Sequence, residues 1–287
     1  MDAHPAPPPD ALTPAGAGRT ALRMERVIAA PPVRVWAALT EPELIAGWFP
    51  ARVTPAPTPG AALVFHFSAA EGPDTTGTVT ELAEPRLLAF TWGEDELRFA
   101  SAPAGDDTLL TLTHTFGDHY GAASFAAGWD RCLAALDALL TGRESVVMDP
   151  SGELHERYVR LLGLDGGTVT TGDGGPSIRY ERQLVRPAET VWAALSGSAT
   201  PLLGGPPPPG FTAPGERPGP ITALRPPRLL AYERPPAGAV RWRLGTGTGH
   251  GARLVLTADL APEESAPDVL AAWRNRIEAL AAELPDR

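Results

Sequence analysis

The stretch Val35-Trp36-Ala37-Ala38-Leu39 returns 156 residues later as Val191-Trp192-Ala193-Ala194-Leu195. Further along, Pro85-Arg86-Leu87-Leu88-Ala89-Phe90 has a counterpart 142 residues later in Pro227-Arg228-Leu229-Leu230-Ala231-Tyr232. Matching blocks in the same order predict two copies of one folding unit. Because the second offset is 14 residues smaller than the first, the second copy has lost 14 residues between its first helix and its central strands.

Each copy has the element order of an α+β domain. In the first copy, alternating apolar residues predict a strand over 22–28 and a meander of strands between 63 and 116. Two short helices that begin at prolines are predicted at 31–39 and 42–48, and a long amphipathic helix at 122–140. A curved antiparallel sheet around one long helix is the compact way to bury both apolar faces.

The same patterns predict the domain boundaries. Residues 1–20 are rich in Pro and Ala and are predicted to be a disordered tail. Lobe 1 is expected at residues 21–142 and the shortened lobe 2 at residues 177–287. The linker, residues 143–176, is expected to contain one short helix over 153–162 and then a loop.

Composition excludes several classes of protein. A net charge of −10 argues against a nucleic-acid or anionic-membrane surface, and no apolar run is long enough to span a bilayer. A single cysteine, Cys132, excludes an intrachain disulfide, so a cytoplasmic location is expected. All 24 basic residues are arginine, which excludes lysine Schiff-base chemistry and, with abundant Ala, Gly and Pro, indicates a GC-rich genome.

Several motifs of the first copy resemble one known superfamily. They are the Trp36 block, Gly47-Trp48-Phe49, the Arg86 block, Leu112-Thr113-His114 and Gly128-Trp129. Together they resemble the helix-grip superfamily (START-like, Bet v 1-like and polyketide-cyclase proteins), and most closely the branch of the activator of Hsp90 ATPase homologue domain. The second copy lacks the Gly-Trp-Phe segment and the histidine, so it resembles a degenerate second helix-grip lobe.

The resemblance implies a hollow between the sheet and the long helix that holds an apolar small molecule. Strand alternation and helix spacing predict which side chains face this hollow, although each of them is also a plausible filler of the core. The ligand-binding candidates are Trp48, Phe65, Phe67, Phe90, Trp92, Leu112, His114, Phe116, Trp129 and Leu133.

Strand alternation predicts that three polar residues also point toward the interior of their lobes. His114 is the one weak catalytic candidate, as a general acid or base, and the alternative is a hydrogen-bonded structural histidine. Arg26 and Arg182 occupy equivalent positions in the two copies, where each is either a clamp for an acidic ligand or half of a structural ion pair. Glu81 and Glu94 are the partners considered for such a pair. No metal-site spacing or cofactor motif is present, so no metal and no cofactor are expected.

Three functions remain open, and ligand binding is preferred. The ligand would be a polyketide-derived chain or an enediyne-type natural product, bound for biosynthesis or for self-resistance. In a self-sacrifice variant, Gly121 or Gly128 would donate a hydrogen atom to the drug. The alternatives are a polyketide aromatase/cyclase and an Hsp90-type co-chaperone. Because residues 204–220 replace a wall element of lobe 2, its hollow is expected to be open and shared with lobe 1 in a monomeric internal pseudo-dimer.

Overall fold

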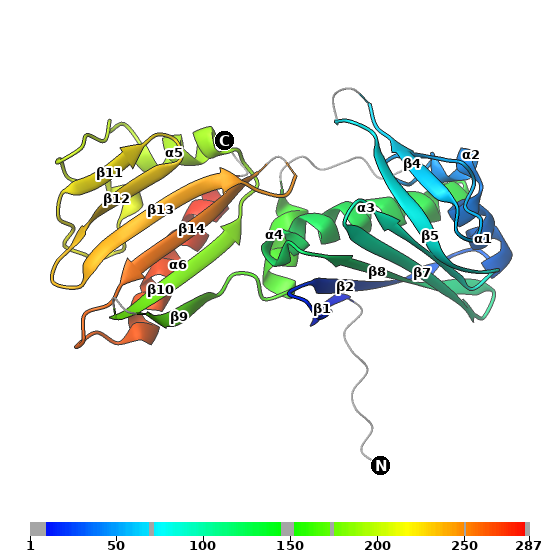
Figure 1. The fold of residues 1–287 in the computed structure, drawn as a ribbon, viewed down its shortest axis with the longest axis horizontal. Coiled ribbons are helices and arrows are strands. Elements are labelled where there is room, and N and C mark those ends of the chain that lie inside the picture. Colours follow the sequence, from blue (N-terminus) through cyan, green and yellow to red (C-terminus); the bar gives the residue numbers. More distant parts are fainter. Residues whose placement is uncertain (1–9, 69–71, 145–151, 173–174, 250, 285–287) are drawn as a thin grey trace, which may run out of the picture. The chain divides into compact units, whose positions relative to one another are not determined.

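The computed structural model describes residues 10–68, 72–144, 152–172, 175–249 and 251–284. The chain divides into two compact units, residues 1–148 and residues 149–287. Each unit contains one antiparallel sheet and one long C-terminal helix (Figure 1). The predicted fold class, two α+β helix-grip lobes with the second shortened, is confirmed.

The first unit is an eight-stranded sheet wrapped around α3. Its strands are ordered β1-β2-β8-β7-β6-β5-β4-β3, and every neighbouring pair is antiparallel. Figure 1 shows α3 lying along one face of this curved sheet. The elements are β1 (Asp10–Pro14), β2 (Thr20–Ile28), α1 (Pro32–Thr40), α2 (Pro42–Ile45), β3 (Arg52–Thr54), β4 (Ala62–His66), β5 (Thr75–Ala83), β6 (Leu87–Trp92), β7 (Asp95–Ala104), β8 (Asp107–Phe116), a 3-10 turn (His119–Gly121) and α3 (Ala122–Thr141).

Local sequence explains where the helices of this unit begin and end. Pro32 occupies the first turn of α1, where its missing N–H removes no helical hydrogen bond. Gly142 ends α3 in the left-handed conformation, with φ of 70°, which glycine adopts without steric cost.

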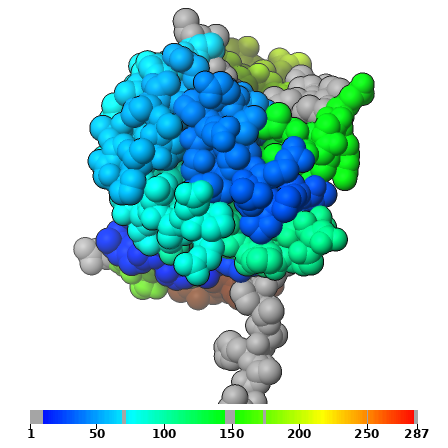
Figure 2. Space-filling view, turned by 90° about the vertical axis from the view of Figure 1, so that its right-hand side faces the viewer, coloured from blue at the N-terminus to red at the C-terminus, as the bar shows by residue number. Residues whose placement is uncertain are grey.

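In Figure 2 the blue atoms of the helical segment and the light-blue to cyan atoms of the strands that follow it form one continuous surface.

Two strands of the first unit were not predicted. β1 lies within the stretch expected to be a disordered tail and pairs with β2, with Asp10 opposite Met24. The prediction was therefore wrong for residues 10–14, while residues 1–9 lie outside the described residues. β3 follows the Gly-Trp-Phe segment and pairs with β4 at the far edge. Both are short edge strands, whose patterns are too brief to show alternation.

The second unit repeats this plan with six strands, in the order β11-β12-β13-β14-β10-β9. The expected loop at 163–176 is wrong, because β9 pairs with β10 along the edge of the sheet. Figure 1 shows α6 packed along this sheet. The elements are α4 (Glu153–Leu161), β9 (Gly167–Gly172), β10 (Gly175–Gln183), α5 (Ala188–Ser196), a 3-10 turn (Pro209–Phe211), β11 (Ile221–Arg225), β12 (Leu229–Arg234), β13 (Gly238–Thr246), β14 (Ala252–Asp259) and α6 (Ala266–Glu283).

The Gly- and Pro-rich stretch of the second unit closes the core that it was expected to leave open. Phe211 is fully buried, and its carbonyl accepts hydrogen bonds from the Trp242 indole (2.9 Å) and the Tyr232 hydroxyl (3.1 Å). Gly210 makes this approach feasible, because a Cβ there would lie 2.1 Å from the Leu195 carbonyl oxygen. The irregular segment thus places one aromatic side chain, Phe211, in the core of the second unit. In the first unit the corresponding part of the chain is a helix and a strand.

Candidate functional site

A pocket of about 340 Å³ opens between one end of the first sheet and α3. Its walls come from the β6–β7 turn, the start of β5, the last part of β8 and one face of α3, and they are mainly apolar. This volume lies in the range of small-molecule sites. The side chains that define its chemistry are Trp92, Asp95, His114, Phe125, Trp129 and Cys132.

The tight β6–β7 turn places two of these side chains at the pocket. Trp92 ends β6 and pairs in register with Asp95, the first residue of β7. Gly93 between them has φ of 59°, a conformation that side-chain-bearing residues rarely adopt. The Trp92 indole N–H donates to Thr75 Oγ1 at 2.7 Å, and its ring stacks on Phe67 with centroids 5.9 Å apart. The Trp92 side chain is therefore held firmly at the pocket.

His114 forms the polar centre of the pocket wall. The Trp129 indole N–H donates to His114 Nδ1 at 3.1 Å, so this nitrogen is the acceptor. His114 Nε2 lies 3.0 Å from Asp95 Oδ2 and donates its proton there. The hydrogen-bond network thus assigns the neutral Nε2–H tautomer. Because both ring nitrogens bond to protein groups, His114 presents neither of them to a ligand.

Among the described residues that line the pocket, Asp95 supplies the one carboxylate. The Asp95 side chain is 29% exposed, and its only hydrogen-bond partner in the described part of the chain is His114. The Cys132 thiol, a further ionisable group of the wall, is neutral, because burial raises its pKa to about 11 and outweighs the opposite effect of Arg131. No arginine lines the pocket among the described residues.

The predicted ligand-binding residues separate into two groups. Trp92, His114 and Trp129 line the pocket. The remaining seven do not line it: six are side chains of the buried core, and Phe67 packs on Trp92. Trp48 and Phe90 border only a gap of about 10 Å³, the size of one water molecule. The six core residues are Trp48, Phe65, Phe90, Leu112, Phe116 and Leu133.

The prediction missed Asp95, Phe125 and Cys132 as pocket residues. Strand alternation could have indicated that Asp95 points inward. It lies on the same face of β7 as Leu97 and Phe99, two and four residues further along, and both of these are buried. Helix spacing likewise places Phe125, Trp129 and Cys132 on one face of α3. An acidic residue at the start of a strand is common on protein surfaces, so composition alone gave no reason to single it out.

Arg26 forms an ion pair with residues that were not considered for it. Its guanidinium contacts Asp10 on β1 at 2.7 Å and Asp130 on α3 at 2.5 Å. The considered partner Glu81 pairs instead with Arg98. The sequence had suggested Glu81 and Glu94 only as possible partners. It gave no sign of the observed ones, because Asp10 belongs to a strand that was not expected and Asp130 is distant in sequence. Arg26 does not line the pocket.

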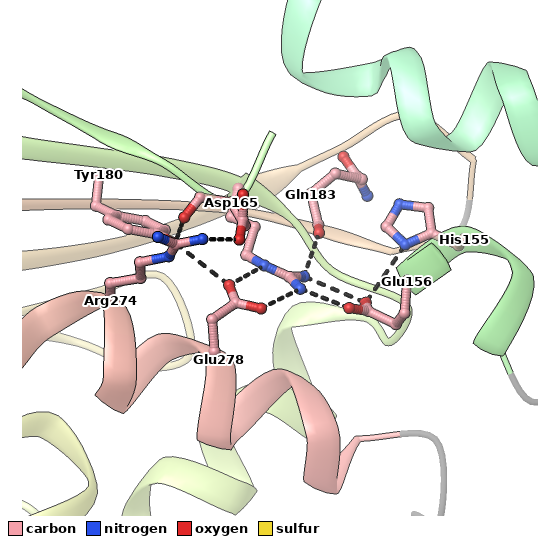
Figure 3. Close-up of polar contacts among 8 residues, drawn as sticks. His155, Glu156, Asp165, Tyr180, Gln183, Arg274 and Glu278 are labelled. Atoms are coloured by element: carbon pink, nitrogen blue, oxygen red, sulfur yellow. Dashed lines mark hydrogen bonds and ion pairs between the residues drawn. The ribbon is translucent and has the colours of Figure 1, made fainter. Parts of the chain in front are cut away.

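Arg182 is fully buried and neutralised by two carboxylates. It contacts Glu156 Oε2 on α4 at 2.5 Å and Glu278 Oε1 on α6 at 2.8 Å. Figure 3 shows these two carboxylates on either side of the guanidinium, with His155 beside Glu156. His155 Nδ1 lies 3.4 Å from Glu156 Oε1. This arrangement ties α4 and α6 to β10 and leaves no open side for a ligand clamp.

The second unit has a pocket of a different kind. It measures about 400 Å³ and lies between the Gly- and Pro-rich segment and the start of α6. Its wall includes an internally paired network in which Arg234 contacts Glu216 at 3.0 Å and Glu264 at 2.6 Å. Because the polar groups of this network are already bonded to one another, the network has a structural role.

Within the described part of the chain, no three His, Cys, Asp or Glu residues are grouped to hold a metal ion. No helix in that part is both long and apolar enough to cross a membrane.

Comparison with known families finds one match, which falls in the first unit. Residues 29–141 match the family described as activator of Hsp90 ATPase homolog 1-like protein. The match covers less than half of the chain and lies entirely in the first unit. It confirms the resemblance that the sequence motifs predicted. No curated protein matches the chain.

Several solved structures are similar to parts or most of the chain. A protein encoded by gene BPP1335 of Bordetella parapertussis is 27% identical, with 56% of this chain and 91% of that chain covered and a TM-score of 0.42. CalU16 from Micromonospora echinospora is 19% identical, covering 54% and 93%, with a TM-score of 0.44. DynU16, from the dynemicin biosynthetic locus, is 20% identical, covering 91% and 96%, with a TM-score of 0.41.

Proposed function

We propose that the protein binds a hydrophobic small molecule in the pocket of its first unit. The observation that carries this proposal is the cavity of about 340 Å³ itself, with a mainly apolar wall and a few convergent polar groups. Such a combination is the usual form of a small-molecule site. Trp92, Phe125 and Trp129 supply aromatic surface for a flat or conjugated molecule.

The family resemblance extends the proposal to the ligand class. We infer a polyketide-derived chain or an enediyne-type natural product, bound by a cytoplasmic protein as a carrier or for self-resistance. Binding ranks above the aromatase/cyclase alternative because that alternative relied on His114 or an arginine as its polar group. Both nitrogens of His114 are engaged, and no arginine among the described residues lines the pocket. The co-chaperone alternative ranks last, because the pocket supports a small ligand rather than a protein partner.

The self-sacrifice variant now has one candidate. Gly128 lines the pocket on α3 and is exposed, whereas Gly121 is buried outside the pocket wall. Of the two glycines predicted as donors, Gly128 is therefore the one whose Cα–H a bound diradical would meet. Mapping the backbone fragments after exposure to an activated enediyne tests this: a cut at Gly128 supports the variant, and an intact chain contradicts it.

Native mass spectrometry tests the binding itself. The panel is a linear conjugated polyene, an aromatic polyketide and an activated enediyne, and a 1:1 non-covalent adduct with the polyene or the polyketide is expected. A side chain at position 128 meets open space at the pocket, so Gly128→Leu should occlude the site and abolish the adduct. Ala134→Leu, on an exposed position of the same helix, is the matched control. An adduct unaffected by Gly128→Leu, or none with any compound, contradicts the proposal.

A further inference from the structure

The wall of the pocket in the first unit is mainly apolar, but it also contains a carboxylate, that of Asp95. Among the described residues that line it, Asp95 supplies the one carboxylate, and His114 with the neutral hydroxyls of Thr75 and Ser124 completes the polar lining. A neutral hydroxyl adapts to a donor or an acceptor, but a carboxylate accepts hydrogen bonds only. The polar specificity of the pocket therefore depends on the Asp95 carboxylate.

The position of that carboxylate is fixed by a chain of hydrogen bonds that runs into the core. Trp129 Nε1–H donates to His114 Nδ1, which leaves the proton on Nε2, and Nε2–H donates to Asp95 Oδ2. Trp129 and His114 are buried, with 4% and 2% of their surfaces exposed. The tautomer of His114 is thus set by a rigid indole, and the imidazole always offers Asp95 a donor.

This chain uses only one of the two carboxylate oxygens. Asp95 Oδ2 accepts from His114, whereas Oδ1 has no hydrogen-bond partner in the described part of the chain. The aromatic rings of Trp92, Phe125 and Trp129 line the same pocket. Aromatic faces attract cations, and a charge-assisted hydrogen bond is roughly twice as strong as a neutral one. Both effects favour the same chemical group in a ligand, a protonated amine.

We propose that Asp95, positioned by His114 and Trp129, makes this pocket selective for ligands that carry a protonated amine on an aromatic or conjugated apolar body, with hydroxyl donors second and carboxylates excluded. This inference rests on the proposed function and names the ligand class of the same site. His114 is a positioning residue here, since it acts on the ligand only through Asp95.

Three fluorescent probes of matched shape test the inference: 9-(aminomethyl)anthracene, 9-anthracenemethanol and anthracene-9-carboxylate. Fluorescence anisotropy at pH 7 gives their affinities for the full chain. We expect the amine to bind about tenfold more tightly than the alcohol, because it adds a charge-assisted bond and cation–π attraction. The carboxylate should bind most weakly, because it meets Asp95 with like charge.

Variants of the protein test whether Asp95 causes the preference for the amine over the alcohol. Asp95→Asn should reduce the amine-to-alcohol ratio to near one, because the amide carries no charge to favour the amine. Glu96→Gln removes the same charge from the next residue of β7, which points to the opposite face of the sheet, and should keep the ratio. His114→Phe should lower the ratio partially, because Asp95 loses the donor that fixes its orientation.

The outcomes distinguish a failure of the amine selectivity from a failure of the proposed binding function. Equal binding of amine and alcohol to the wild-type protein overturns the selectivity and leaves the proposed binding function standing. The same loss of ratio in Glu96→Gln and Asp95→Asn assigns the effect to net charge and also overturns it. If none of the three probes binds, the proposed function fails together with the inference.

Discussion

Arg182 and Glu156 form a bidentate ion pair inside the second unit, with Nη2 2.5 Å from Oε2 and Nη1 3.2 Å from Oε1. The Arg182 side chain is fully excluded from solvent, and that of Glu156 is 11% exposed. Burial of an unpaired charge is so costly that each member of such a pair depends on the other. The pair joins α4 to β10, so it fixes the helix that follows the undescribed residues 145–151 onto the second unit.

Replacement of Glu156 should therefore destabilise the second unit. We expect Glu156→Gln to lower its free energy of unfolding by about 3 kcal/mol, the lower end of the cost of removing one partner of a buried pair, because Glu278 remains. Native-state hydrogen exchange is the suitable measurement, since it reports the opening free energy of peptides from each unit separately.

The control for this variant lies on the same helix. Glu153→Gln changes the same chemical group at an exposed position and should alter stability by less than about 0.5 kcal/mol. Equal effects of the two substitutions would show that charge on α4, rather than the buried pair, determines stability. Faster exchange confined to peptides of the first unit would also contradict the assignment.

The same pair predicts how stability depends on pH. Burial opposes ionisation of Glu156, but His155 and Arg182 outweigh it, and the pKa falls from 4.5 to about 2. A pKa below its unfolded value means that the stabilisation is complete above about pH 4.5 and disappears as the pH falls toward 2. The stability difference between the wild type and Glu156→Gln should therefore shrink over this interval. A difference that stays constant from pH 6 to pH 2.5 would refute the ionised pair.

The fold could be predicted largely from local patterns. Residues 22–28 alternate clearly, and the face containing Trp129 and Leu133 repeats at helical spacing, so strand β2 and helix α3 follow from the sequence. β9 could not be predicted in this way, because Gly167–Gly172 contains one large apolar residue and its pairing with β10 is a tertiary contact.

The site could be predicted only in part, for a physical reason. Strand phase tells which side chains point inward, but it does not tell whether they leave space. Phe65 and Trp92 both face inward, yet Phe65 is fully buried by its neighbours and Trp92, at the end of its strand, borders the pocket. The difference arises from packing among several elements, which no single stretch of sequence encodes.

Two glycines of the first unit offer a contrast in stability. A Cβ on Gly77 would lie 1.7 Å from the Thr91 carbonyl oxygen, so Gly77→Ala must push strands β5 and β6 apart. We expect Gly77→Ala to lower the free energy of unfolding by about 3 kcal/mol, as for other overpacking substitutions. A Cβ on Gly128, within α3, meets nothing within 4 Å, and Gly128→Ala should stabilise by about 1 kcal/mol through helix propensity. Urea unfolding followed by hydrogen exchange of the first unit measures both, and a stable Gly77→Ala protein would contradict the close approach.

Cys132 provides a chemical test of the pocket wall, since it is the single cysteine and intact mass reads its alkylation directly. Burial raises the pKa of its thiol from 9.0 to about 11, and only the thiolate reacts. Iodoacetamide should therefore react at pH 8 roughly 100-fold more slowly than with the urea-unfolded chain. The rate should still rise about tenfold between pH 9 and pH 10, where an ordinary thiol approaches its plateau. A rate that levels off between pH 9 and pH 10 in the folded protein would show that the thiol is not buried in the wall. A bound ligand should slow the reaction further.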